Sequence, residues 1–420
     1  MKRKSIIYLS IYFLIIIVFF NCAKKPDKNT GRGEILFYTR FTPDEMTLWE
    51  ESIKEFNKLY PDIKVKIENY PYAQYWPKLQ TMIAAGVAPD VIFLESTRVP
   101  VFLEKDCLLP LNEFIKNGNL KETDFDDGVI DAYKKDGNIY GLPNDIAMYA
   151  MFYNKTLFDQ RGVPYPKTGW TWDDFLQKAE KLTFGSKNDK VYGFAIGWTP
   201  MLWILQAGGD YFTDNKNPVK SAINSRESIK GFEFVMDLMY GRKVAPSVVE
   251  VQSLGNHQEM FKMGKVAMII EGHWVVPSFE REIKNFEWDF VECPKGKRNA
   301  VFNFGSCFAI PKLAKNPVGA YKFIEFMAGE KGQLILLKGG FSTPVLKSSK
   351  VKQFFINRSQ RNEKVFLDSI RYAKLLPFTP KFDELNNVMS EELDLLWLKK
   401  EPIQTVLNRL AVKMEKIVKE

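Results

Sequence analysis

Residues 34–94 decide the fold, and they read EILFYTRFTPDEMTLWEESIKEFNKLYPDIKVKIENYPYAQYWPKLQTMIAAGVAPDVIFL. Apolar runs at 34–38 and 90–94 suit buried strands, and apolar residues alternate as a further strand at 63–67. Helical patterns separate these three segments. The order strand, helix, strand, helix, strand predicts a doubly wound α/β sheet with right-handed crossovers.

The helices between these strands carry their own signals. Thr42, with Glu45 three residues later, predicts a helix start with a capping box, and residues 75–85 form the second helical pattern. Ligands of such sheets bind at the carboxyl ends of the strands. The side chains that follow the strands, Phe41 and Glu95 among them, are therefore candidate ligand contacts.

A second set of elements continues the alternation after residue 140. Strands are predicted at 148–153, 191–196 and 265–270, and helices after Thr171, at 225–240 and at 256–263. No internal repeat relates the two sets. The fold class that follows is α/β in two halves.

Composition excludes several classes of function. Aromatic residues make up 14% of the 420 residues, with 33 Phe, 17 Tyr and 9 Trp, so some rings are expected to face a ligand. Two histidines and four cysteines without CxxC spacing leave a zinc site or a His-based triad without ligands, and no metal or cofactor is predicted. The net charge of +8 is spread along the chain, so no nucleic-acid partner is predicted.

The N-terminus predicts export. Three basic residues precede an apolar run at 5–20, which is shorter than the roughly 20 residues of a membrane-spanning helix and suits a signal peptide over 1–21. Cys22 directly after the run resembles the lipobox of bacterial lipoproteins, although residues 19–21 depart from the usual small residues. An uncleaved anchor is the alternative. Residues 22–33 are polar and read as a tether.

Four segments resemble a known family in its order: KLQTMIAAGVAPDVIF at 78–93, NIYGLPNDIAMYAMFYNKTLFDQRGVPYPKTGWTW at 138–172, MFKMGKVAMIIEGHW at 260–274 and AYKFIEFMAGEKGQLILLKGGFSTP at 320–344. They are similar to the extracellular solute-binding proteins of ABC importers, in particular the sugar-binding family that includes maltose-binding proteins. With the lipoprotein-like start, the resemblance covers nearly the whole chain.

The resemblance implies two lobes with crossed hinge connections, each lobe a mixed, mostly parallel sheet flanked by helices. Lobe one is expected from 31–141 and 272–328, and lobe two from 142–271 and 329–420. It further implies a carbohydrate ligand, the transmembrane subunits of an ABC permease as partner, and a monomeric, non-enzymatic lipoprotein facing the periplasm or cell surface.

The binding site is predicted from the chemistry of sugars, which have apolar C–H faces and a rim of hydroxyls. Such ligands need flat aromatic rings together with amides and carboxylates. The resemblance places a stacking aromatic at Trp274 and residues against the ligand at 303–306. The candidate ligand contacts are Phe41, Glu95, Asn144, Asp145, Trp198, Trp274, Phe304, Ser306 and Phe341.

Several alternatives stay open at this stage. Glu95 and Asp145 could be the paired carboxylates of a surface glycosidase, on opposite walls of a cleft. Arg40 and Arg98 could instead indicate glycerol phosphodiesters or sugar phosphates, and a sensory binding protein would have the same sequence features. Beyond Cys22, the cysteines can form at most one disulfide or remain three buried thiols; they are Cys107, Cys293 and Cys307.

Overall fold

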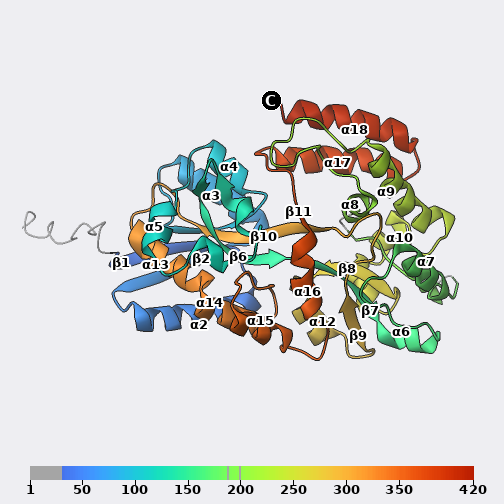
Figure 1. Ribbon diagram of the computed structural model, residues 1–420, viewed down its shortest axis with the longest axis horizontal. Coiled ribbons are helices and arrows are strands. Elements are labelled where there is room, and N and C mark those ends of the chain that lie inside the picture. Colours follow the sequence, from blue (N-terminus) through green and yellow to red (C-terminus); the bar gives the residue numbers. More distant parts are fainter. Residues whose placement is uncertain (1–30, 187–188, 198–199) are drawn as a thin grey trace, which may run out of the picture.

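The computed structural model describes residues 31–186, 189–197 and 200–420. It has two lobes, each built around a sheet with helices packed against it (Figure 1). The sheet of the first lobe has the order β11-β10-β3-β1-β2, with β6 also paired to β10. Its strands are β1 Gly33–Thr39, β2 Ile63–Asn69, β3 Val91–Glu95, β6 Gly141–Ala147, β10 Val301–Ala309 and β11 Ala373–Leu375.

The N-terminal half of this sheet forms as the sequence predicts. β1 pairs parallel with both β2 and β3, and the antiparallel β10 lies beside β3. Ile35 and Phe37 of β1 are fully buried in the core beneath the sheet. At the start of the next helix, Glu45 accepts a hydrogen bond from the Thr42 amide (2.8 Å) and donates its own amide to the Thr42 hydroxyl, which completes the predicted capping box.

The sheet of the second lobe differs from the prediction. Its named strands, β7 Tyr149–Asn154, β8 Met268–Gly272 and β9 Trp288–Val291, pair antiparallel in the order β8-β7-β9. Residues 191–196 form isolated bridges and not the predicted strand: Val191 pairs antiparallel with Phe184, and Tyr192 and Ala195 pair parallel with Val266 and Ile269. Between them, Gly193 lies close against the helix of Ala179, where an added Cβ would come within 2.1 Å of the Ala179 carbonyl oxygen.

The helices are divided between the lobes. Those on the first lobe's side are α2 Pro43–Leu59, α3 Tyr72–Ala84, α4 Val99–Glu104, α5 Asn112–Asn117, α13 Pro317–Ala328, α14 Glu330–Leu337 and α15 Ser349–Ile356. Those of the second are α6 Lys155–Gln160, α7 Trp172–Lys181, α8 Met201–Ala207, α9 Arg226–Met236, α10 Val248–Ser253, α11 His257–Lys262, α12 Val276–Glu282, α16 Lys364–Ser369, α17 Phe382–Trp397 and α18 Ile403–Ile417.

Shorter elements complete the chain. A two-stranded hairpin joins β4 Lys134–Lys135 to β5 Asn138–Ile139. Short helical turns are η1 Glu122–Asp124, η2 Ile130–Tyr133, η5 His273–Val275 and η6 Ile370–Tyr372, and a π-helical segment, η4 Asp237–Gly241, extends α9. Within the described residues, no helix combines the length and apolar character that a membrane crossing requires.

Strand pairing moves the predicted lobe boundaries. β6 pairs with β10 in the first sheet, so the chain first crosses after residue 147 and not at 141. β9 pairs with β7, so the second crossing lies between 291 and 301 and not at 272. α14 packs on α2, which leaves residues 330–337 with the first lobe. The positions expected from nearby glycines differ from these, because strand pairing and not a glycine sets where the chain leaves a sheet.

The cysteines of the described residues are free thiols. Cys293 and Cys307 are buried and Cys107 is partly exposed. Burial raises the pKa of the Cys107 thiol above its ordinary value, which keeps it protonated at neutral pH. Of the two possibilities left by the sequence, the structure therefore has thiols and not a disulfide.

Candidate functional site

The carboxyl ends of the strands of the first sheet meet at a cleft between the lobes. Arg40 and Phe41 follow β1, Glu95 ends β3, and Asn144 and Asp145 lie near the end of β6. The first half of the antiparallel β10 contributes its residues at the same edge. Together with residues of the second lobe, these side chains surround a cavity of about 600 Å³.

Aromatic rings line this cavity on both sides. Phe41 stacks on Trp49, with ring centroids 4.2 Å apart and planes 13° apart, and meets the edge of Phe93 at 4.8 Å. Asn69, the last residue of β2, fixes the position of Phe41 by accepting a hydrogen bond from its amide (2.6 Å) and donating one to its carbonyl oxygen (2.8 Å). Phe304 and Phe341 are half-buried in the same cavity.

Trp274 comes from the second lobe, in the turn that follows β8. Its indole folds back over the preceding backbone, and a Cβ on Gly272 would lie 1.7 Å from the indole ring. Only glycine therefore leaves room for the ring in this position. Trp274 meets the edge of Tyr149 at 5.3 Å and stays partly exposed to the cavity.

Hydrogen bonds fix the polar residues that the first lobe contributes to the cavity, which we call the first wall. Asp145 accepts from the amide (2.9 Å) and the hydroxyl (2.7 Å) of Ser306, and the Asn144 side chain donates to the same hydroxyl (3.2 Å). Burial raises the pKa of the Asp145 carboxyl to about 6, although the hydrogen bonds from Ser306 act in the opposite direction. The surroundings of the Asp145 carboxyl therefore disfavour its charged form.

Four polar atoms around this cavity are buried without a hydrogen-bond partner in the described part of the chain. They are Nε of Arg40, Oδ1 of Asn144, Nδ1 of His273 and Oγ1 of Thr343. Buried polar groups are ordinarily paired, because leaving one unpaired costs about 1–3 kcal/mol. The residues that carry these atoms all line the cavity, and both donors and acceptors are among the atoms.

A second cavity of about 400 Å³ continues the first. Both are lined by Tyr72, Glu95 and Phe304, so the cleft is continuous past these three residues. The walls of the second cavity are again rich in rings, and the second lobe contributes one face of α17 along its whole length. Its aromatic residues are Tyr72, Tyr149, Tyr211, Phe302, Phe304, Phe382 and Trp397.

Each arginine that lines the two cavities has an acidic partner. Arg40 is paired with Glu95, and its guanidinium lies 5.0 Å from the ring centre of Tyr72. Arg98 is paired with Asp383 of α17 across the cleft. A third pair also joins the lobes: Arg281 of α12 in the second lobe lies 3.1 Å from Asp44 at the start of α2 in the first lobe. Among the described residues no lysine lines either cavity, and the acidic residues outnumber the arginines.

The predicted site residues come together. Phe41, Glu95, Asn144, Asp145, Trp274, Phe304, Ser306 and Phe341 all line the first cavity. Trp198 lies outside the described residues. The sequence analysis missed Tyr72, which follows β2 as Phe41 follows β1, so the rule for strand ends could have found it. Nothing in the sequence pattern indicated that α17 lines the cleft, because a local helical pattern does not show where the helix packs in the fold.

The glycosidase arrangement is contradicted by the strand pairing. Ser306 of β10 lies opposite Glu95 on β3 and opposite Asp145 on β6, so both carboxylates belong to one sheet and one wall. A glycosidase needs its two carboxylates on either side of the bond that is cleaved. Arg40 is half-buried against Glu95. No cluster of three or more His, Cys, Asp or Glu side chains suited to a metal occurs among the described residues.

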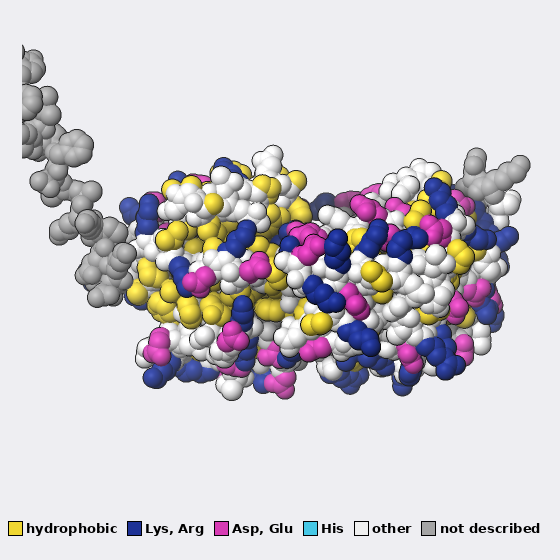
Figure 2. Space-filling view, turned by 90° about the horizontal axis from the view of Figure 1, so that it is seen from above, with side chains coloured by type: hydrophobic (Ala, Val, Ile, Leu, Met, Phe, Trp, Pro, Cys, Tyr) yellow, Lys and Arg dark blue, Asp and Glu magenta, His cyan; other side chains and the backbone are white. Residues whose placement is uncertain are grey.

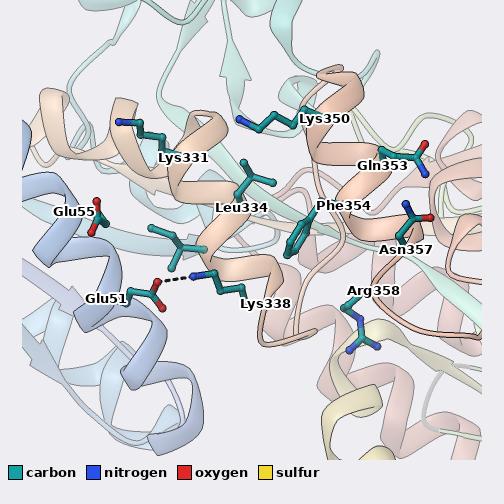
Figure 3. A pocket seen from close by; sticks show the side chains of 11 residues that line it. Glu51, Glu55, Lys331, Leu334, Lys338, Lys350, Gln353, Phe354, Asn357 and Arg358 are labelled. Atoms are coloured by element: carbon teal, nitrogen blue, oxygen red, sulfur yellow. Dashed lines mark hydrogen bonds and ion pairs between the residues drawn. The ribbon is translucent and has the colours of Figure 1, made fainter.

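A larger hollow lies outside the cleft, between α2, α14 and α15 (Figure 3). It measures about 1030 Å³ and is open to solvent, and its floor carries Leu334 and Phe354. Its charges are largely satisfied within the chain, since Lys338 binds Glu51 at 2.6 Å and Lys350 binds Glu330 at 2.8 Å. The narrower cleft between the lobes is the better binding site, because it encloses a ligand on two sides.

Comparison with known proteins agrees with the two-lobed fold. The family model of the bacterial extracellular solute-binding proteins matches residues 51–361. The chain belongs to this family. As a solute-binding protein it is 26% identical over 352 residues to the arabinooligosaccharide-binding protein of Bacillus subtilis (strain 168), a match that covers 79% of this chain and 77% of the relative.

Two further relatives point the same way. The galactooligosaccharide-binding protein of Bacillus subtilis (strain 168) is 24% identical, over 81% of this chain and 82% of its own. Among solved structures, an ABC substrate-binding protein of Listeria monocytogenes in complex with cycloalternan superposes with a TM-score of 0.82 at 26% identity. That likeness covers 91% of this solute-binding protein and 98% of the neighbour, so the two-lobed fold is shared throughout.

Proposed function

We propose that this protein is the substrate-binding component of an ABC importer and captures an uncharged sugar or oligosaccharide between its lobes. The observation that carries the proposal is the first cavity, where unpartnered buried polar atoms lie beside aromatic rings. Hydroxyl groups satisfy such atoms, and C–H faces stack on rings. The ligand contacts proposed in the cleft are those predicted from the sequence and described above, with Tyr72 added.

The relatives support a carbohydrate ligand. The two Bacillus relatives described above are named as arabinooligosaccharide- and galactooligosaccharide-binding proteins. The structure of the Listeria neighbour is a complex with cycloalternan. The continuation of the first cavity into the second gives room along the cleft for more than a single sugar unit. An oligosaccharide is therefore proposed over a monosaccharide.

The charges of the cleft argue against phosphorylated ligands. A phosphate site needs arginine, lysine or free backbone amides that face the anion. Here Arg40, Arg98 and Arg281 are each paired with a carboxylate, and further acidic side chains surround them. An anionic ligand would have to displace one of these pairs and meet the acidic excess.

Ligand contacts from both lobes would stabilise the closed state in this proposal. A ligand shifts an opening equilibrium only by its different affinity for the two states, so contacts on one lobe alone would not close the cleft. Asp145 and Ser306 lie on one wall and Trp274 on the other. The protein is proposed to release its ligand unchanged, as a monomer, to the transmembrane subunits of the permease.

The N-terminal segment is proposed to tether the protein to a membrane. Residues 1–21 would act as the signal peptide, Cys22 would carry the lipid, and 22–33 would link it to the fold. The two lobes would then face the periplasm or the outside of the cell, where a solute-binding protein meets its ligand.

A thermal-shift screen of the full chain tests the ligand class. The panel holds arabino-, galacto- and maltooligosaccharides, their monosaccharides, and glycerol phosphodiesters and sugar phosphates. A ligand at 100 times its dissociation constant stabilises the folded chain by about 2.7 kcal/mol, which raises the melting temperature. A shift with phosphorylated compounds alone would refute the proposal, and so would release of reducing ends from an oligosaccharide on incubation with the protein.

A further inference from the structure

The outer face of α3 on the first lobe is unusually poor in charge. Between residues 70 and 89 the only charged side chain is Lys78. Val87 just beyond the end of α3 is 55% exposed, while Met82 and Ile83 in its last turn are half-buried. Figure 2 shows hydrophobic side chains spread over the first lobe and mixed charges over the second. Exposed surfaces depleted in charge are typical of interfaces.

This face adjoins the point where the chain enters the fold. Asn316 donates hydrogen bonds to the carbonyl oxygens of Gly31 (3.2 Å) and Arg32 (3.1 Å), and its own amide donates to Asp90 (2.8 Å). The entry is therefore clamped between the loop before β3, which carries Val87, and the loop after β10. That second loop carries Leu313, whose side chain is 52% exposed.

The length of chain before this entry limits how far it can lie from a membrane. Eight residues separate Cys22 from Gly31, and a fully extended chain spans at most about 3.3–3.6 Å per residue, or about 30 Å in all. With the lipid on Cys22 in the bilayer, the entry and the loops clamped to it must stay within this distance of the surface. β1 begins at the outer end of the first lobe, so that end is the part held close (Figure 1).

We propose that the first lobe rests on the lipid bilayer through the α3 face, defined by Met82, Ile83, Val87 and Leu313. The inference rests on the membrane tether of the proposed function. Contact with lipid removes these side chains from water, which favours binding. The nearby Arg32 and Lys312 are already paired with Asp62 and Asp106, so the apolar side chains are proposed to carry the contact. The contact is thus expected with uncharged lipids and in molar salt.

An environment-sensitive fluorophore tests the contact in the full chain. The chain is isolated from membranes with Cys107→Ser, which removes the partly exposed thiol, and is reconstituted into phosphatidylcholine vesicles. Val87→Cys or Leu313→Cys then carries the fluorophore. The controls are Val412→Cys on α18 and Val249→Cys on α10, whose side chains are 70% and 60% exposed on the second lobe. The unsubstituted Cys107→Ser chain gives the background labelling.

The proposal expects blue-shifted emission and a several-fold loss of quenching by an aqueous quencher at Val87 and Leu313, but not at Val412 or Val249. The signal should persist in molar salt. Chain that floats with the vesicles while all four positions stay equally exposed overturns the contact and leaves the tether intact. Chain that fails to float refutes the tether and the contact together.

Two further outcomes would assign the face to another occupant and overturn the bilayer contact. A blue shift at Val87 and Leu313 without vesicles, growing with protein concentration, would indicate a second copy of the chain. A shift that requires permease subunits in the vesicles would indicate a protein partner.

Discussion

The two walls of the cleft are built in different ways. The wall of the first lobe is the edge of a sheet, where Glu95, Asn144, Asp145 and Ser306 are fixed by hydrogen bonds to one another and to neighbouring strands. The wall of the second lobe is formed by β7, turns and helices, with Trp274 after β8 and further rings on α17. Both walls carry rings, Phe41 and Phe304 among those of the first, but the hydrogen-bonded polar cluster around Ser306 belongs to the first wall.

We expect the two walls to have different roles in ligand recognition. Hydrogen bonds from a rigid sheet edge distinguish the positions of hydroxyl groups, because unpaired polar atoms are costly. Stacking on rings tolerates many sugars, since each has an apolar face. We therefore expect the first wall to determine which sugar binds and the second to determine how tightly and at what length.

The largest effect is expected on the first wall. Asp145→Ala removes an acceptor for the ligand and takes away the acceptor to which the Ser306 amide and hydroxyl donate, so we expect affinity to fall about a hundredfold. Asp383→Ala, which removes an exposed carboxylate from the second wall, is the matched control and should cost less than tenfold. Isothermal titration with the best ligand of the screen measures both. Equal losses would contradict the division between the walls.

A somewhat smaller effect is expected for the ring of the second wall. Trp274→Ala removes an apolar surface worth about 1.5–3 kcal/mol, so affinity should fall ten- to a hundredfold for every sugar that binds. Trp274→Phe should recover part of the loss. Phe354→Ala, in the hollow outside the cleft, is the control that should leave affinity unchanged. A loss confined to one sugar would assign specificity to this ring and not to the first wall.

The length of the ligand can be tested in the second cavity. Ser390 of α17 is exposed and lines that cavity, so Ser390→Trp should fill it without disturbing the core. We expect long oligosaccharides to lose about tenfold or more in affinity and the shortest ligands to lose nothing. Asn387→Trp on the same helix, at an exposed position that does not line the cavity, is the control. An equal loss for short and long ligands would place the short ligand in the second cavity.

The same difference explains what the sequence could predict. The first wall was predictable because strand ends carry a positional rule: Glu95 and Phe41 were found from the strands before them. The second wall was predictable only at Trp274, where the family resemblance and Gly272 indicated it. Rings such as Phe382 were missed, because α17 and α18 form a pair that is positioned by packing of α18 on α9, which lies far earlier in the chain. The boundaries of the lobes failed for the same reason, since strand pairing and not glycine position fixes them.

A smaller effect should appear in the pH dependence of stability. The folded state raises the pKa of Asp145 from 3.8 to about 6, so between these values the folded chain binds more protons than the unfolded chain. This group therefore lowers stability as pH rises from about 4 to 6. Asp145→Asn removes this contribution and should gain on the order of 2 kcal/mol relative to the original chain over that range. Urea denaturation at both pH values measures it, and parallel pH profiles for the two chains would contradict it.

The smallest expected effect concerns the ion pair that joins the two walls. Arg98 is 19% exposed and lies 5.0 Å from the ring centre of Trp76, while its partner Asp383 is 55% exposed, so solvent screens the pair and its worth is at most about 1 kcal/mol. Arg98→Asp or Asp383→Arg should each weaken ligand binding about threefold at low salt, because like charges then face each other across the closing cleft. The double exchange should restore affinity, and molar salt should remove the difference between the variants. Failure of the exchange to restore affinity would mean that Arg98 acts through Trp76 and Tyr72 on its own wall, and closure would then depend on the ligand contacts alone.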